Sequence, residues 1–310
     1  MTAVIQPGQI TEAQPEVPAL RPADRKIFRR RAERLRALAA GHAMEDYLSF
    51  MARLADAQQS ALDIYSEVPE AIPDPQAVAR ARDLGLPPFP AQGWARDSSW
   101  RAALRNILED VRREAPEPLR IAIDELMSMA SAELEEMADR ILTGNDPMLD
   151  PATAPLIGAA LQVYWTHLST SIDQADPQRE QQPSTCPVCG SHPVASLRRI
   201  GGVEQGLRYL HCSLCETEWN YVRIKCTSCE STTGIGYYGV DGEREAVEAE
   251  ACDDCHGYLK LMHMERDADV DAIADDLATL ALDIAMADEG YTRVGLNLLF
   301  VPGEEVSTAN

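Results

Sequence analysis

Eight cysteines, the whole cysteine complement of this 310-residue chain, form four Cys-x-x-Cys pairs. The pairs are Cys186/Cys189, Cys212/Cys215, Cys226/Cys229 and Cys252/Cys255. Each cysteine of the last two pairs lies forty residues after its counterpart in the first two. A Cys-x-x-Cys turn holds two sulfur atoms on one side of a tight loop, and two facing turns supply the four thiolates of a tetrahedral metal centre. The spacing therefore predicts one metal-binding unit that occurs twice.

Each unit of a duplication must close its own site, which divides the eight ligands into two sets. The expected sets are Cys186, Cys189, Cys212 and Cys215 in the first unit and Cys226, Cys229, Cys252 and Cys255 in the second. A cross-braced pairing is the alternative. A four-thiolate tetrahedron suits both zinc and mononuclear iron, so the residues leave the metal open. A closed site of this kind has no free coordination position, which argues against hydrolytic metal catalysis.

The residues between the paired turns read as a β-hairpin in each unit. The hairpins turn at Gly201-Gly202 and at Asp241-Gly242, again forty residues apart,. His211 and His256 stand directly beside cysteines, but four thiolates already complete each site. We therefore expect both imidazoles to lie outside the ligand sets. This layout is typical of a zinc ribbon or a rubredoxin-like knuckle.

Disulfides and a thioredoxin-like dithiol are the other readings of such pairs. The chain shows no signal peptide at its start, so we expect a cytoplasmic protein whose thiols stay reduced,. Four pairs at a repeat spacing also argue against a single redox dithiol. Metal binding is the better interpretation.

The chain is strongly acidic, with 50 acidic against 28 basic residues and a formal charge of −22. Zinc ribbons often contact nucleic acid, but a surface of this charge repels phosphate, and we expect no nucleic-acid partner. The basic run Lys26–Arg36 is read as one helix face, and no uninterrupted apolar stretch follows it as an export signal requires,. No window approaches the roughly 20 apolar residues that span a bilayer, so membrane insertion is not expected.

The sequence before the cysteines is predicted to form a helical domain. Apolar residues recur at helical spacing over about residues 43–66, beyond Ser98 or Ser99, after Pro116 up to Gly144, and after Pro151,. The fold class expected is a mainly α N-terminal domain, two tandem small β modules of rubredoxin-like or zinc-ribbon type, and a C-terminal helix. The expected boundaries are a flexible tail over 1–22, the helical domain over 23–173, a linker over 174–185, the modules over 186–222 and 223–264, and a C-terminal helix with a docked tail over 265–310.

The chain resembles the formate dehydrogenase accessory proteins of the FdhE family. The resemblance lies in the helical segment Leu35–Gln58, in Cys186-Pro-Val-Cys-Gly190 with the three later pairs, and in the terminal segment Asn297–Gly303. It covers most of the chain. Four pairs at this spacing after a helical segment are far more specific than a single Cys-x-x-Cys.

The resemblance implies a cytoplasmic accessory protein that binds the catalytic subunit of a respiratory formate dehydrogenase and assists its maturation. It also implies rubredoxin-like iron at the eight cysteines, with zinc as the other metal. It implies no catalysis by the chain itself, in keeping with the lack of any phosphate loop or nucleophile elbow. A redox protein acting on the client's metal centre is the second hypothesis, and a zinc-ribbon nucleic-acid binder is a third. The sequence leaves the oligomeric state and the client-binding residues open.

Overall fold

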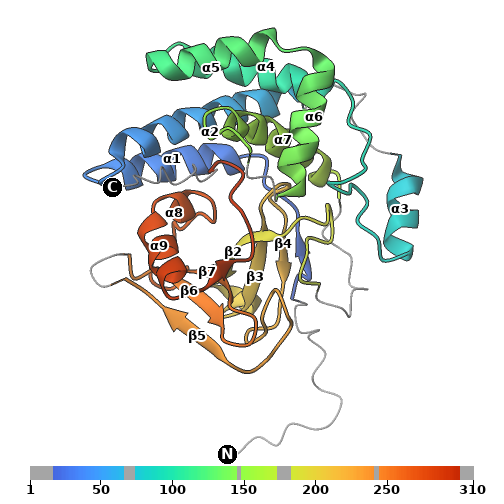
Figure 1. Cartoon of the computed structure of the whole chain (residues 1–310). Helices are drawn as coiled ribbons and strands as arrows, with labels where there is room; N and C mark the ends of the chain where they lie inside the picture. Colours follow the sequence, from blue (N-terminus) through green and yellow to red (C-terminus); the bar gives the residue numbers. More distant parts are fainter. Residues whose placement is uncertain (1–16, 66–73, 145–147, 173–182, 241–243, 301–310) are drawn as a thin grey trace, which may run out of the picture.

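The computed structural model describes residues 17–65, 74–144, 148–172, 183–240 and 244–300, where a layer of helices lies over one β-sheet (Figure 1). The helices before the first cysteine are α1 (Ile27–Ala39), α2 (Glu45–Tyr65), α3 (Pro75–Asp83), α4 (Ser99–Arg112), α5 (Glu117–Ser128), α6 (Ser131–Thr143) and α7 (Ala154–Ser169). The mainly α N-terminal domain and the β-rich C-terminal part are as predicted.

Helix α7 is the centre of the helical layer. Every one of its residues except His167 is buried, because the helix is apolar on all sides and packs against α2, α4 and α6,. The stripes predicted for α2 and α4 face this core. Their buried members include Leu48, Met51, Ala52 and Ala55 of α2 and Leu104, Ile107, Leu108 and Val111 of α4.

Two helices depart from the sequence-based prediction. The single helix predicted between Pro116 and Gly144 is broken into α5 and α6 at Met129 and Ala130, whose backbones are extended. The Glu133 carboxylate accepts a hydrogen bond from the Ala130 N–H and so starts the second helix,. The proline-rich stretch between α2 and α4, from Pro69 to Pro90, contains a helix that was not predicted, α3, which stands apart from the others and buries none of its residues (Figure 1).

The β-sheet joins both cysteine units. Its strands are β1 (Leu20–Arg21), β2 (Pro193–Arg198), β3 (Arg208–Cys212), β4 (Glu218–Asn220), β5 (Ile235–Tyr238), β6 (Val247–Cys252), β7 (Gly257–His263) and β8 (Thr292–Arg293). The order is β1-β4-β3-β2-β7-β6-β5, and β8 pairs with β7. Each unit contributes an antiparallel three-stranded sheet, β2-β3-β4 or β5-β6-β7. The predicted turn at Gly201-Gly202 lies between β2 and β3, whereas residues 241–243, which hold the second predicted turn, are outside the described residues.

The two units are fused through strands β2 and β7, which pair in parallel from Ala195↔Lys260 to Arg198↔His263. A buried ion pair spans the same junction: Arg208 of β3 lies 2.7 Å from the Glu250 carboxylate of β6. The prediction of tandem β modules therefore holds, but they form one continuous sheet. Strand β5 is left as an edge strand within the described residues, with β6 as its partner.

The N-terminal segment differs from the flexible tail expected over 1–22. Residues 17–22 are described, and Leu20–Arg21 forms strand β1 on the edge of β4. The Tyr209 hydroxyl donates to the Pro18 carbonyl at 2.7 Å, and Arg21 lies 2.6 Å from the Glu204 carboxylate. These contacts hold the segment in the sheet. Residues 1–16 and most of the predicted linker over 174–185 lie outside the described residues.

The prediction of one long helix after the second unit is wrong. The structure has two short helices there, α8 (Ala274–Leu277) and α9 (Leu280–Asp288). At the break, the buried ammonium of Lys260 of β7 donates to the carbonyl oxygens of Asp276 and Thr279, each at 3.0 Å, and the backbone N–H groups that these carbonyls accept are those three residues later. In a continuous helix those carbonyls would accept backbone N–H groups one turn later. Lys260 also binds the Asp283 carboxylate at 2.6 Å, so its charge is compensated.

The described end of the expected docked tail, up to residue 300, packs on the helical layer, whereas residues 301–310 lie outside the described residues. Leu299 is fully buried, and the Tyr47 hydroxyl donates to its carbonyl at 3.4 Å. Gly158 of α7 allows the close approach, since a Cβ atom there would lie 2.6 Å from the Leu298 carbonyl oxygen. Only glycine fits this helix surface with the segment in place.

The substitution Gly158→Ala is therefore expected to destabilise the protein by about 1–3 kcal/mol, the usual cost of overpacking a core. Urea unfolding of both proteins measures the change. Gly239→Ala is the matched control, because a Cβ at Gly239 meets nothing within 4 Å. Equal losses in the two variants would contradict the tight contact between α7 and the terminal segment.

Candidate metal centres

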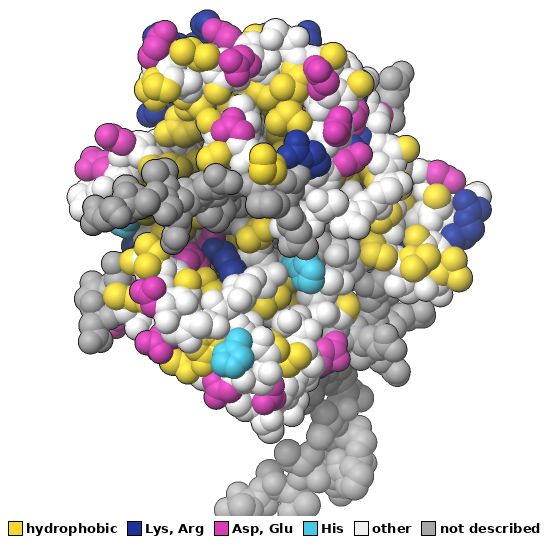
Figure 2. All heavy atoms as spheres, viewed as in Figure 1, with side chains coloured by type: hydrophobic (Ala, Val, Ile, Leu, Met, Phe, Trp, Pro, Cys, Tyr) yellow, Lys and Arg dark blue, Asp and Glu magenta, His cyan; other side chains and the backbone are white. Residues whose placement is uncertain are grey.

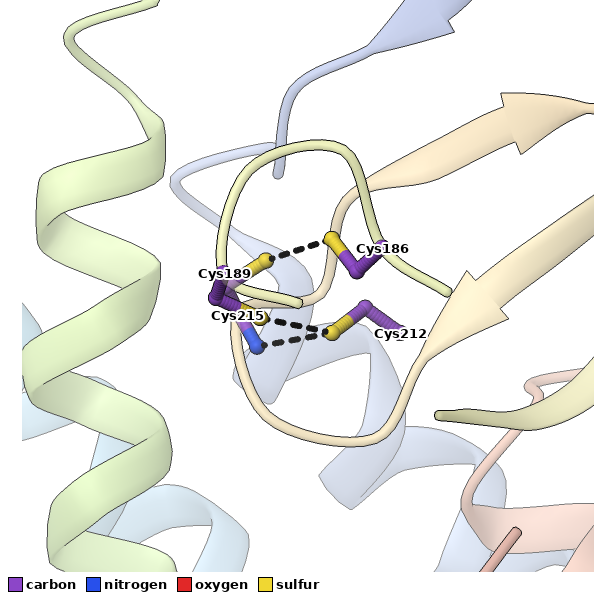
Figure 3. A group of neighbouring side chains, drawn as sticks. All are labelled: Cys186, Cys189, Cys212 and Cys215. Atoms are coloured by element: carbon purple, nitrogen blue, oxygen red, sulfur yellow. Dashed lines mark hydrogen bonds between the residues drawn. The ribbon is translucent and has the colours of Figure 1, made fainter. Parts of the chain in front are cut away.

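The eight cysteines lie in two groups of four, Cys186/Cys189/Cys212/Cys215 and Cys226/Cys229/Cys252/Cys255. Within each group the sulfur atoms all lie within 4.8 Å of one another. Figure 3 shows the four side chains of the first group pointing toward one another between two loops. The predicted grouping is confirmed, and the cross-braced alternative is excluded.

Each Cys-x-x-Cys loop closes through one residue with a left-handed backbone. These residues directly follow the second cysteine of each pair: Gly190 (φ 75°), Glu216 (φ 59°), Glu230 (φ 62°) and His256 (φ 54°). Left-handed geometry is uncommon for residues other than glycine, so three such residues at equivalent positions mark a loop that the cysteines hold in place. The loop shape thus repeats at the same forty-residue interval as the cysteines.

The donor geometry fits a tetrahedral ion. Metal–sulfur bonds of about 2.3 Å place tetrahedral sulfurs about 3.8 Å apart. Sulfur pairs in hydrogen-bonding contact are 3.4 and 3.5 Å apart in the first group and 3.7 Å apart in the second. Backbone N–H groups also point at the sulfurs, such as Leu214 N–H to Cys212 Sγ and Ser228 N–H to Cys226 Sγ. Eight thiolates in this arrangement form two four-cysteine metal sites.

Four of the thiols, those of Cys189, Cys212, Cys215 and Cys226, have shifted pKa values because they are crowded and partly or fully buried. Burial raises the pKa of Cys212 and Cys215 well above the usual range, and the thiols of Cys186 and Cys189 raise it further. Burial also opposes ionisation of Cys189, but hydrogen bonds from Cys186, Cys212 and Cys215 hold its pKa well below the usual value. Burial likewise raises the pKa of Cys226 to about 12. Four such sulfurs ionise together only around a cation, which is what a metal ion supplies.

The helical layer holds the first site from one side. Ser169 Oγ of α7 donates to the Cys215 carbonyl at 3.0 Å, and Gln162 Nε2 donates to the Ser213 carbonyl at 2.9 Å. The loop before α4 holds the other turn, since the backbone N–H groups of Phe89 and Ala91 donate to the carbonyls of Val188 and Cys189. No sequence motif pointed to these residues. The one sequence feature that could have indicated them is the largely apolar sequence of α7, in which Gln162 is a polar residue.

Neither of the two histidines beside the cysteines belongs to a sulfur group. His211 is buried, and its Nε2 lies 2.7 Å from Glu216 Oε2. Burial disfavours the charged imidazole, but Glu216 and Glu218 outweigh it and raise the pKa of His211 to about 9. A protonated imidazole cannot ligate a metal. His256 instead packs its ring against Tyr291, with the centroids 5.5 Å apart.

Three family descriptions match the chain in tandem. They are "FdhE, N-terminal" over residues 17–182, "FdhE, central domain" over residues 185–223 and "FdhE, C-terminal domain" over residues 224–300. The chain belongs to the FdhE family. The central match contains the first cysteine group and the C-terminal match contains the second, so each FdhE domain after the helices carries one site.

Full-length relatives support the same assignment. The chain is 42% identical to an FdhE homolog of Edwardsiella ictaluri over 94% of this chain and 93% of that protein. It is 40% identical to the protein FdhE of Escherichia coli over 93% and 92% of the two chains. The crystal structure of the FdhE protein from Pseudomonas aeruginosa covers 92% of this chain and 100% of its own, with a TM-score of 0.83 and 38% identity. The resemblance found in the sequence is thereby confirmed.

Surface charge and the apolarity of the helices both bear on possible partners. On the face shown in Figure 2, acidic side chains are scattered over the helical layer and the sheet, with a few basic ones among them. No helix in the described ranges is long and apolar enough to cross a membrane.

Proposed function

We propose that this chain is a cytoplasmic accessory protein that binds the catalytic subunit of a respiratory formate dehydrogenase and supports its maturation. The observation that carries the proposal is FdhE membership over nearly the whole chain, with both four-cysteine groups formed. A binding role also agrees with the closed sites, because four thiolates leave no coordination position for a substrate. The chain itself is proposed to catalyse no formate oxidation.

The proposed metal is rubredoxin-like iron, with zinc as the other metal that the donor set accepts. Bound at Cys186, Cys189, Cys212 and Cys215 or at their repeat counterparts, either ion would cross-link two loops of the sheet. An iron ion would supply one-electron chemistry as well. The eight cysteines would hold the ions, and the surrounding N–H groups would stabilise the negative sulfurs.

Removal of the gene from its host is expected to abolish respiratory formate dehydrogenase activity while leaving the catalytic polypeptide present. The tagged protein should recover that polypeptide from lysates, and a tagged acidic protein of similar size is the control for charge. Normal enzyme activity in the deletion strain, together with no recovery, would contradict the proposal. Repeating the recovery in high salt identifies the kind of contact. An apolar or aromatic contact with the client should persist, whereas salt should screen a purely electrostatic one.

A redox role toward the client is a second candidate, favoured by the partial exposure of the second site. Cys229 is exposed and Cys255 is intermediate, so an ion there lies near the protein surface. Metal analysis and a visible spectrum of protein purified without oxygen separate the two roles. Two irons with thiolate charge-transfer bands that bleach with reductant support electron transfer, while two colourless zinc ions exclude it.

A further inference from the structure

The two metal sites have the same ligands and the same loop shape, but they differ in their surroundings. All four cysteines of the first site are buried, with exposures between 0% and 1%. Both of its loops are covered by the helical half of the chain, which reaches them through α7 and the segment before α4. Gly190 adds a further contact, since its Cβ position would lie 3.5 Å from the Pro87 ring.

Backbone N–H groups bind sulfur at both sites, but more such bonds are found at the first; at the second, Cys226 accepts from the Ser228 N–H at 3.3 Å. In the first site Cys186 accepts from the Val188 N–H, and Cys212 accepts from the N–H groups of Leu214 and Cys215, all at 3.4 Å. The Cys215 thiol also lies 3.2 Å from Thr217 Oγ1. Such bonds stabilise thiolates and hold the sulfurs in place when a metal bond breaks.

The second site lies toward the open end of the sheet. Cys229 is exposed and Cys255 is intermediate, while Cys226 and Cys252 are buried. Its loops are bound by residues of the second unit and the chain after it, such as Thr292, whose N–H donates to the His256 carbonyl at 2.7 Å. The neighbouring linker between the units exposes Ile224, and the nearby edge strand β5 exposes Tyr237. Among the described residues, no hydrogen bond or ion pair joins helices α1 to α7 to the loops of this site.

We propose that the two sites are kinetically unequal: the first holds its ion permanently as part of the fold, and the second exchanges its ion with outside ligands through Cys229. Exchange at a saturated four-thiolate ion requires an incoming ligand to approach as one metal–sulfur bond breaks. At the second site the Cys229–metal bond would break as the sulfur of an incoming thiol takes its place, and the proton that this thiol loses would pass to the released Cys229 thiolate. No electron moves in this step.

A soft sulfur donor, such as a small thiol or a cysteine of a partner, is the class of ligand that suits an ion already bound by thiolates. At the first site the same approach requires the helical layer to separate from the sheet. Opening of a buried, hydrogen-bonded region costs far more free energy than access to an exposed side chain. This inference rests on the geometry of the two groups and does not depend on the client.

The test is the rate at which each ion leaves the protein. The full-length chain, loaded with two zinc ions, is mixed with an excess of the chromogenic chelator 4-(2-pyridylazo)resorcinol, and zinc transfer is followed by absorbance. Two phases of one ion each are expected, with rates that differ by at least about tenfold, since the slow phase requires local unfolding. A single phase that releases both ions would overturn the proposal.

Alkylation assigns the phases without any substitution. A brief pulse of N-ethylmaleimide on the zinc-loaded chain, read by peptide mass spectrometry, should label Cys229 first and leave Cys186, Cys189, Cys212 and Cys215 unlabelled. Earlier labelling of any first-site cysteine would contradict the assignment.

Two variants give the same assignment through the chelator. Cys229→Ser should remove the fast phase and keep the slow one. Ser169→Ala removes the donor from α7 to the Cys215 carbonyl, so it should accelerate the slow phase and leave the fast phase unchanged. An unchanged slow phase in Ser169→Ala, or a lost slow phase in Cys229→Ser, would show that the helical layer does not protect the first ion.

Discussion

Replacement of Cys212 by serine is expected to leave one bound metal ion per chain instead of two. Cys212 is fully buried and its Sγ lies 3.4 Å from Cys189 Sγ, so the substitution removes one corner of the first site only. Structural zinc sites of small domains supply on the order of 10 kcal/mol or more of folding free energy. The loop that holds Cys212 and Cys215 also accepts hydrogen bonds from α7. We therefore expect a large fall in thermal stability that includes the helical layer.

Cys252→Ser is the matched variant, because Cys252 is the repeat counterpart of Cys212 forty residues later and is buried as well. It should also lose one ion, but the melting of the helices should change much less, since the second site contacts the sheet. Native mass spectrometry counts the ions, and far-ultraviolet circular dichroism follows the helices. Retention of two ions in either variant, or loss of both in each, would contradict two independent sites.

The metal sites were predictable because the spacing of the cysteines along the sequence identifies their ligands. A Cys-x-x-Cys pair specifies its own loop, and the exact repeat of four cysteines identifies which pairs face each other. The residues that follow the pairs were harder to interpret. Glu216, Glu230 and His256 adopt the left-handed backbone that Gly190 suggests by its residue type, and only the repeat alignment connects them.

The parts that could not be predicted depend on contacts between residues distant in the sequence. Nothing local to β2 or β7 indicates that they pair in parallel and fuse two units into one sheet. The apolar pattern of residues 270–284 is compatible with one helix, but at the break between α8 and α9 the ammonium of Lys260, from strand β7, binds the carbonyls of Asp276 and Thr279. Helix periodicity reports burial, and it does not report such a competing hydrogen-bond donor.

The fused sheet changes how the two units relate. A junction of parallel strands, with Arg208 and Glu250 paired across it, makes the units one structural body. Yet the helical layer contacts the loops of the first unit, and β5 ends the sheet on the far side of the second. A duplicated unit has thus acquired two environments, which is the structural basis for unequal metal exchange.

The substitution Arg31→Leu is expected to destabilise the protein by about 3–5 kcal/mol, the typical cost of removing one partner from a buried ion pair. Arg31 of α1 is fully buried, and its guanidinium binds both carboxylate oxygens of Glu216, at 3.1 and 2.6 Å. Its Nε also lies 3.1 Å from Asp271 Oδ1. Without Arg31, the Glu216 carboxylate stays buried with His211 as its one remaining charged neighbour among the contacts of the described residues.

Arg36→Leu on the same helix is the control, because its ion pair with Asp56 has side chains 51% and 46% exposed. Exposed pairs of this kind contribute about 0–1 kcal/mol. Urea unfolding of the metal-loaded proteins measures both losses. Glu216 directly follows the ligand Cys215, so Arg31→Leu should also weaken the first site and speed the slow phase of zinc release, whereas Arg36→Leu should not. Equal effects of the two substitutions would mean that the buried carboxylate is compensated without Arg31, and that α1 does not stabilise the first metal site through Glu216.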